Sequence, residues 1–192
     1  PRPEQLHADL ANRYPVVTGR TQAGGDLLSG EGPGNDTYFK GALTAHTLRL
    51  LIGDEAFFRA TRRLVYGRPD PRPGNFAPRF ASTREFQQIV AEEAGRNLDW
   101  FFDAYLRRAA LPELVEARDG DRLRLEWRAG GPFPMPVEVR IGNRVERVTM
   151  EGGRGELTVP AGTHVVIDPA ARVLRRSEAV ERYQAWQAKA RR

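Results

Sequence analysis

The pattern of apolar and polar positions divides the chain into a helical half and a β half. From about residue 37 to residue 106, apolar side chains recur every three or four positions, which places them on one face of a helix, and RPDPRPGNFAPRF (residues 68–80) interrupts this period. After Pro112 they alternate with polar side chains, as in half-buried strands. The sequence therefore predicts an α+β fold, in which part of a helical bundle is followed by a small antiparallel β-sandwich and a C-terminal helix.

The first two predicted helices meet at a glycine. The first begins at about Thr37, with Asp36 or Thr37 as its N-cap, and ends at Gly53. Asp54 follows directly and can cap the second helix. The apolar face of the first helix consists of Ala42, Ala45, Leu48 and Leu51 or Ile52.

Two further helices are predicted before Pro112. Ser82 followed by Glu85 has the spacing of a capping box and starts the third, which Gly95 ends. Asn97 precedes the fourth, whose aromatic and leucine side chains recur at helical spacing over NLDWFFDAYLRRA.

Short alternating segments separated by glycine-containing turns make up the β half. The predicted strands are 122–127, 135–141, 144–150, 156–160 and 163–167. A last strand is expected around Val173 and Leu174, Asp168-Pro169 is expected to shape a turn, and Ser177 can cap a C-terminal helix.

These signals suggest three regions. They are a helical part over residues 1–112, a β-sandwich over residues 113–176 and a C-terminal helix or tail over residues 177–192. Before the first long helix, residues 4–12 could form a short helix. Residues 13–36 are rich in Gly, Pro, Thr and Ser without a period, which predicts an irregular segment.

Composition narrows the classes of function. The hydrophobic content of 40% is enough for a buried core, and the sequence has no apolar run long enough to span a membrane. Cysteine is absent, which excludes disulfides, thiolate zinc sites and a cysteine nucleophile. The formal charge is +5, and every basic residue except Lys40 and Lys189 is arginine, but the arginines are spread along the chain among acids. This distribution does not favour nucleic-acid binding, which needs clustered basic residues.

Searches for standard catalytic motifs find none. The three histidines, His7, His46 and His164, lack the i, i+4 spacing of a helical zinc pair, and neither H-E-x-x-H, G-x-S-x-G nor a phosphate-binding loop occurs. His46 is interpreted as an ordinary helix residue rather than a ligand. The adjacent Glu92 and Glu93 are interpreted as a solvated helix face.

At Tyr38-Phe39-Lys40-Gly41 the sequence resembles the zinc aminopeptidases of the aminopeptidase N type, which are thermolysin-like zinc peptidases (gluzincins). In that family a Tyr-x-Lys-Gly element opens a helix, and a Leu-Arg pair and Gly-Asp-Glu-x-Phe-Phe follow, as in Leu48-Arg49 and GDEAFF here. A threonine-acid cap, an Asp-Trp-Phe-Phe box and a terminal Leu-Pro then recur in the same order. The resemblance covers residues 36–114, and the β half is similar to a domain found in many bacterial members.

The resemblance implies one catalytic role in this chain, for Tyr38. In the family this phenol donates a hydrogen bond to the oxyanion that forms when zinc-bound water attacks the peptide carbonyl. Lys40 and Gly41 complete the motif, with Gly41 expected to permit close approach of a neighbouring helix and Lys40 to pair with an acid outside this chain. Phe39 stands where the family commonly has glutamate.

The resemblance also implies what the chain lacks. The family's zinc ligands, its catalytic glutamate and its Gly-x-Met-Glu-Asn loop are not in this sequence, which also begins at Pro rather than Met. We therefore expect a C-terminal portion of a peptide-hydrolysing enzyme that binds no metal and is inactive alone. The alternatives are a relative of the glycyl aminopeptidases, which share Tyr-x-Lys-Gly-Ala-Leu, and a noncatalytic protein-interaction module of a degenerate peptidase.

Overall fold

A computed structural model describes Leu10, Asn12 and residues 14–17, 36–68, 70–75, 77 and 79–190. The predictions for residues 4–12 and 13–36 lie almost entirely outside the described residues, and His7 lies outside them too. The described helices are α2 (Asp36–Ile52), α3 (Asp54–Tyr66), α4 (Thr83–Ala94), α5 (Asp99–Leu106) and α6 (Glu178–Ala190). The described strands are β1 (Glu113–Asp119), β2 (Arg122–Arg128), β3 (Val137–Ile141), β4 (Arg144–Val148), β5 (Arg154–Thr158) and β6 (Val165–Ile167).

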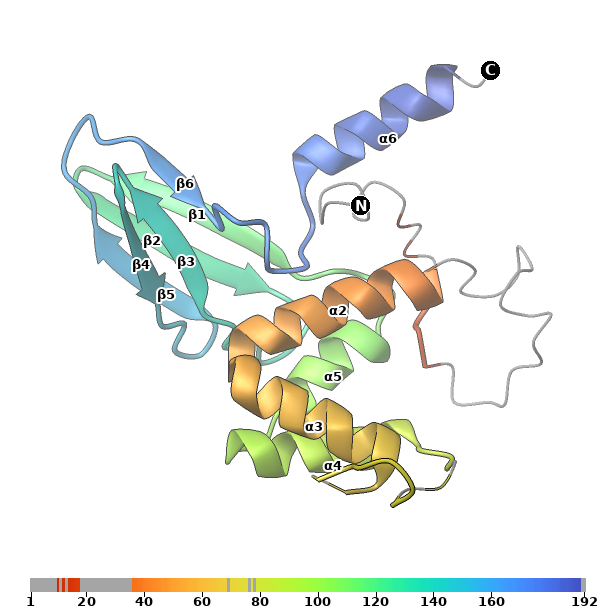
Figure 1. The fold of residues 1–192 in the computed structure, drawn as a ribbon. Helices are drawn as coiled ribbons and strands as arrows, with labels where there is room; N and C mark the ends of the chain where they lie inside the picture. Colours follow the sequence, from red (N-terminus) through yellow and green to blue (C-terminus); the bar gives the residue numbers. More distant parts are fainter. Residues whose placement is uncertain are drawn as a thin grey trace.

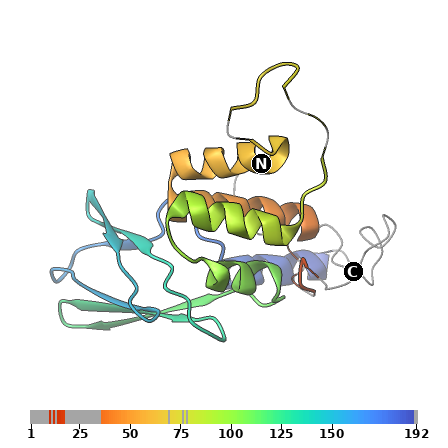
Figure 2. The ribbon, with the colours of Figure 1, turned by 90° about the horizontal axis from the view of Figure 1, so that it is seen from below.

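The predicted fold class is confirmed. Helices α2 to α5 pack together, and two antiparallel sheets lie at one end of them (Figure 1 and Figure 2). The strand orders are β1-β2-β5 and β4-β3-β6, so β2 and β3 are the central strands. No helix in the described ranges combines the length and the apolar character needed to cross a membrane.

Alternation builds the sandwich core. Every second side chain of the central strands is buried, and these residues are Leu123, Leu125, Trp127, Val137, Val139 and Ile141. A Cβ added at Gly155 of β5 would lie 2.7 Å from Val148 Cγ1 and 2.9 Å from the Thr149 carbonyl oxygen. Glycine therefore stands inside this strand because backbone approaches closely there.

The helix signals are largely confirmed. Ser82 Oγ accepts a hydrogen bond from Glu85 N at 3.1 Å, and Gly95 ends α4 with φ 65°. Half of the capping box is missing, however, because the Glu85 carboxylate pairs with Arg79. The prediction that Asp54 caps α3 is wrong, because Gly53 occupies the N-cap position. Asp54 is the first residue of α3, and its carboxylate lies 2.6 Å from Arg49 Nη2.

The interpretation of Glu92 and Glu93 as a solvated face is confirmed for Glu92, whose side chain is 61% exposed, but it is wrong for Glu93. Glu93 is largely covered, because its carboxylate contacts Arg59 Nε and Arg63 Nη1 of α3, each at 2.7 Å. Glu92 lies 2.6 Å from the same Arg63. Hydrogen bonds from Arg59 and Arg63 hold the pKa of Glu93 below its usual range. These ion pairs join α4 to α3.

Near the junction of the two halves, one strand was not predicted and one predicted strand is not formed. The segment before β2 forms a full strand, β1, which pairs with β2 over seven positions from Glu113 to Asp119 and was not predicted. Conversely, Val173 and Leu174 form no strand. Instead, Leu174 N donates to Thr47 Oγ1 at 2.9 Å, and its carbonyl accepts from the Tyr105 hydroxyl at 2.6 Å. Side chains of α2 and α5 thus satisfy the backbone that a neighbouring strand would otherwise pair.

Aromatic side chains join the helices to the sandwich. Phe133, which precedes β3, lies edge-on to Trp100 and Tyr105 of α5 at centroid distances of 5.1 and 5.7 Å, and to Trp127 of β2 at 5.1 Å. Burial raises the pKa of Tyr105 well above its usual range, and the charge of Asp168 adds to the shift. Because these rings belong to one buried cluster, the two halves share a continuous core.

The predicted turn at Asp168 is confirmed, and so is the C-terminal helix. The Asp168 carboxylate accepts hydrogen bonds from Arg172 N at 2.9 Å and Val173 N at 3.0 Å, which holds the turn. Helix α6 starts directly after Ser177 and extends away from the sandwich (Figure 1). None of its side chains is buried.

Candidate functional site

Tyr38 lies in the first turn of α2, and its side chain faces solvent. Tyr38 is 61% exposed, whereas Asp36 and Lys40, two positions before and after it, are 2% and 0% exposed. Successive helix positions are rotated by about 100°, so a residue two positions away lies on the opposite face. The same turn therefore buries two charged side chains on one face and presents the phenol on the other.

Asp36 anchors the start of this turn. Its Oδ2 accepts a hydrogen bond from the backbone N of Asn12 at 2.6 Å. A carboxylate in the first turn also interacts favourably with the positive end of the helix dipole. Thr37, the other expected cap, has a buried hydroxyl oxygen without a hydrogen-bond partner among the described residues.

Lys40 anchors the other end of the turn. Its Nζ donates to the carbonyl oxygens of Arg108 at 2.9 Å and Ala109 at 2.8 Å. Arg108 and Ala109 follow the end of α5 and its C-cap Arg107, so their carbonyl groups belong to the segment that leads to β1. Backbone oxygens of this chain thus take two of the three ammonium donors. The expected pairing of Lys40 with an acid outside this chain stays a prediction.

Burial changes the pKa of the Lys40 ammonium. It lowers the pKa of Lys40 from 10.5 to about 8, because the charged ammonium loses its hydration, and the nearby Asp36 carboxylate partly opposes this shift. Arg108 does not direct its charge at Lys40, since its guanidinium donates to the carbonyl oxygen of Ala129. Among the described residues, the Asp36 carboxylate is the charge that raises the pKa of this ammonium.

No neighbouring helix approaches Gly41 closely among the described residues. A Cβ added at this position would meet no heavy atom of a described residue within 4 Å. Close approach of a neighbouring helix within the described part of the chain therefore does not explain this glycine.

Replacing Gly41 with Ala is expected to stabilise this chain by up to about 1 kcal/mol, because alanine is the better helix former and the added methyl group has space. Urea denaturation of the two chains measures the difference. A loss of stability would show instead that a further segment packs against Gly41.

His46 lies in a cleft beside the junction of α2 and α3. The cleft, of about 390 Å³, is lined by His46, Arg49, Leu50, Gly53, Asp54, Glu138, Arg147 and Arg172. Its acids are already paired, Asp54 with Arg49 and Glu138 with Arg172. No group of three or more His, Cys, Asp or Glu side chains in the described ranges could hold a metal ion. These contacts are consistent with the interpretation of His46 as an ordinary helix residue.

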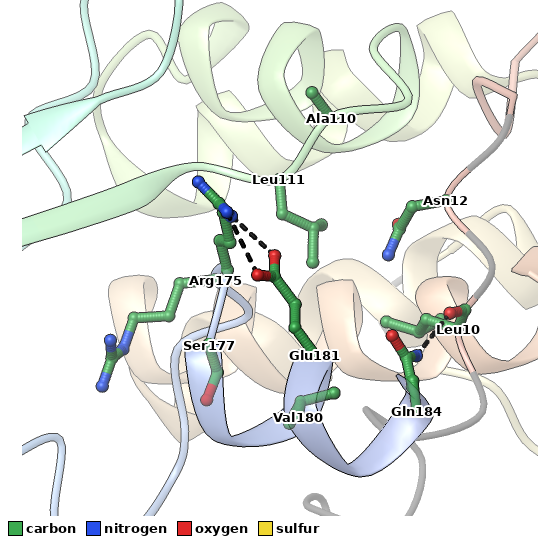
Figure 3. Close-up of a pocket in the computed structure, with 10 residues that line it drawn as sticks. Leu10, Asn12, Ala110, Leu111, Arg175, Ser177, Val180, Glu181 and Gln184 are labelled. Carbon is green, nitrogen blue, oxygen red and sulfur yellow. Dashed lines mark hydrogen bonds and ion pairs between the residues drawn. The ribbon is translucent and has the colours of Figure 1, made fainter. Parts of the chain in front are cut away.

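A second pocket lies beside the anchored turn (Figure 3). It has a volume of about 280 Å³ and lies between α6 and the chain that follows α5. Its lining includes Asn12, whose backbone binds Asp36, and Ala110, which follows the carbonyl groups held by Lys40. Leu10, Leu111 and Val180 supply apolar surface, while Glu181 is paired with Arg176 at 2.6 Å. The described residues that line this pocket include no histidine that could act as a base for Ser177.

Sequence reasoning selected Tyr38 as a candidate but did not predict the contacts that hold its turn in place. The contact of Asp36 with Asn12 and those of Lys40 with Arg108 and Ala109 join segments 24, 68 and 69 positions apart. A charged pair spaced i, i+4 within an otherwise core-like helix was the available signal. It indicates that the two side chains share a face, and that face is buried.

Comparison with known proteins gives a structural match. No protein-family model matches the sequence, and no curated protein does either. Among solved structures, the fold is similar to aminopeptidase A of Legionella pneumophila, determined in complex with aspartic acid, with a TM-score of 0.60 and 15% sequence identity. The match covers 89% of this chain but 22% of the Legionella protein. The chain thus has a fold found in part of an aminopeptidase.

Proposed function

We propose that this chain is the C-terminal portion of a zinc-dependent aminopeptidase of the aminopeptidase N type, which removes N-terminal residues from peptides. The observation that carries the proposal is the exposed phenol of Tyr38 on a helix turn whose flanking charged residues are buried. The order of motifs over residues 36–114 and the similarity to part of an aminopeptidase support it.

Tyr38 stabilises the oxyanion of the tetrahedral intermediate in this proposal. A neutral phenol donates one hydrogen bond, and the exposed ring leaves its hydroxyl free to reach a peptide bound beside α2. The N-terminal end of α2 adds a favourable dipole for developing negative charge. A donor of this type typically contributes about 3 kcal/mol to transition-state stabilisation.

The remaining catalytic groups would come from residues outside this chain. The described residues do not form a metal site, so they do not fit the zinc that the proposed activity requires. The matched part is also a minor share of the Legionella protein's length. In this proposal the chain contributes Tyr38, one wall of the substrate-binding cleft and the β-sandwich.

The isolated chain is accordingly expected to bind no stoichiometric zinc and to hydrolyse no aminoacyl amide. The zinc content after equilibrium dialysis of untagged protein, and release of the chromophore from a panel of aminoacyl nitroanilides, measure the two properties. The full-length protein is the positive control. Turnover by the isolated chain, or one tightly held zinc per chain, would contradict the proposal.

A protein-interaction module is the second candidate function. The observation that favours it is α6, which exposes Tyr183 and Trp186 as a stacked pair with ring centroids 5.8 Å apart. Exposed aromatic side chains of this type are enriched at protein interfaces. The reading frame upstream of Pro1 distinguishes the candidates, since H-E-x-x-H there supports the enzyme and its absence supports the module.

A glycyl aminopeptidase relative would instead show a strong preference for substrates with N-terminal glycine.

A further inference from the structure

Lys40 connects the turn that carries Tyr38 to the end of α5. The side chain is fully buried, and both of its hydrogen bonds reach carbonyl groups of the segment that joins α5 to β1. Aliphatic packing alone could be supplied by methionine, which is also a good helix former. A lysine at this position adds two directed hydrogen bonds to the backbone carbonyl groups of Arg108 and Ala109.

The geometry of the turn transmits this restraint to Tyr38. Asp36 and Lys40 are four positions apart and share a face, and Tyr38 lies between them at about 200° from each around the helix axis. Asp36 is bonded to Asn12 and Lys40 to Arg108 and Ala109, so contacts on both flanks restrain the backbone from which the phenol extends. Exposure leaves the ring itself with little packing of its own. The position of the phenol therefore depends on the position of this turn.

We propose that Lys40 is a positioning residue for Tyr38, which fixes the first turn of α2 against the end of α5 so that the phenol meets the reacting carbonyl. This inference rests on the proposed function of Tyr38. A misplacement of a catalytic group by about 1 Å can cost on the order of a hundredfold in rate, so a loosened turn affects catalysis without any contact between Lys40 and substrate.

A double-mutant cycle in the full-length enzyme tests the proposal. Lys40→Met keeps the unbranched shape of the side chain, one atom shorter, but removes the ammonium and both of its hydrogen bonds, and it is expected to lower kcat about tenfold with little change in KM. In the Tyr38→Phe background the same substitution is expected to lower kcat little further, because the group that it positions is already absent. The matched control is Lys189→Met, which removes the other lysine of the chain, an exposed residue near the end of α6. It is expected to leave kcat unchanged.

The outcomes separate this inference from the proposed function. If Tyr38→Phe leaves kcat unchanged, the proposed function itself is overturned. If Tyr38→Phe lowers kcat but Lys40→Met has no effect, or has the same effect in both backgrounds, Lys40 does not act through Tyr38 and the inference is overturned. If Lys40→Met does not fold, as judged by circular dichroism, Lys40→Gln replaces it in the cycle, since its amide keeps a donor, and the same loss of additivity is required.

Discussion

Replacing Tyr38 with Phe in the full-length protein is expected to lower kcat by about a hundredfold or more while KM stays close to the wild-type value. The substitution removes one hydroxyl group from a side chain that is 61% exposed. A hydrogen bond made mainly to the oxyanion stabilises the transition state more than the bound substrate, so its loss appears in kcat. Steady-state kinetics with an aminoacyl nitroanilide measure both constants.

Tyr183→Phe is the matched control for this experiment. Tyr183 is also an exposed tyrosine, but it lies on α6, far along the chain from the candidate site. Neither substitution is expected to change the free energy of unfolding by more than about 0.5 kcal/mol, because surface changes rarely do. An unchanged kcat in Tyr38→Phe would refute the assigned role, and an equal loss in Tyr183→Phe would show a general effect of removing a phenol.

The fold was predictable where local chemistry decides the structure. Ser82 and Gly95 delimit α4 as expected, because a serine N-cap and a left-handed glycine act within a few residues. Prediction failed where side chains distant in the sequence form hydrogen bonds with the backbone of a segment. Leu174 belongs to an apolar segment that looks like a strand, yet Thr47 and Tyr105 take its hydrogen-bonding groups across 127 and 69 positions. No local pattern records such a contact.

The candidate site also combines features that the sequence predicted with features that it did not. The resemblance pointed to Tyr38, and the structure places that residue, exposed, on the first turn of α2. The contacts of Lys40 were not predictable, because its partners are the backbone oxygens of Arg108 and Ala109, which every residue type carries. The packing role expected for Gly41 stays a prediction, because no described residue lies within 4 Å of a Cβ added there.

The buried ammonium of Lys40 is expected to make the stability of the chain increase with pH between about pH 8 and 10.5. Burial lowers the pKa of Lys40 to about 8 in the folded chain, against 10.5 for an ordinary lysine. Below pH 8 both states carry the proton, and the folded state bears the full cost of the buried charge. Between the two pKa values the unfolded state binds more protons, so the free energy of unfolding increases with pH.

Comparison with Lys40→Met isolates this contribution. Urea denaturation of both proteins gives the difference in the free energy of unfolding, wild type minus variant, which is expected to increase by about 2 kcal/mol from pH 7 to pH 9.5. Tyr105 acts in the opposite direction above about pH 10, since its raised pKa keeps it protonated in the folded state, but it is present in both proteins and cancels. Lys189→Met, which removes an exposed lysine, is expected to show no such trend. A difference that stays constant or decreases over this range would mean that the ammonium of Lys40 is not buried at the cost described, and that the first turn of α2 is held in another way.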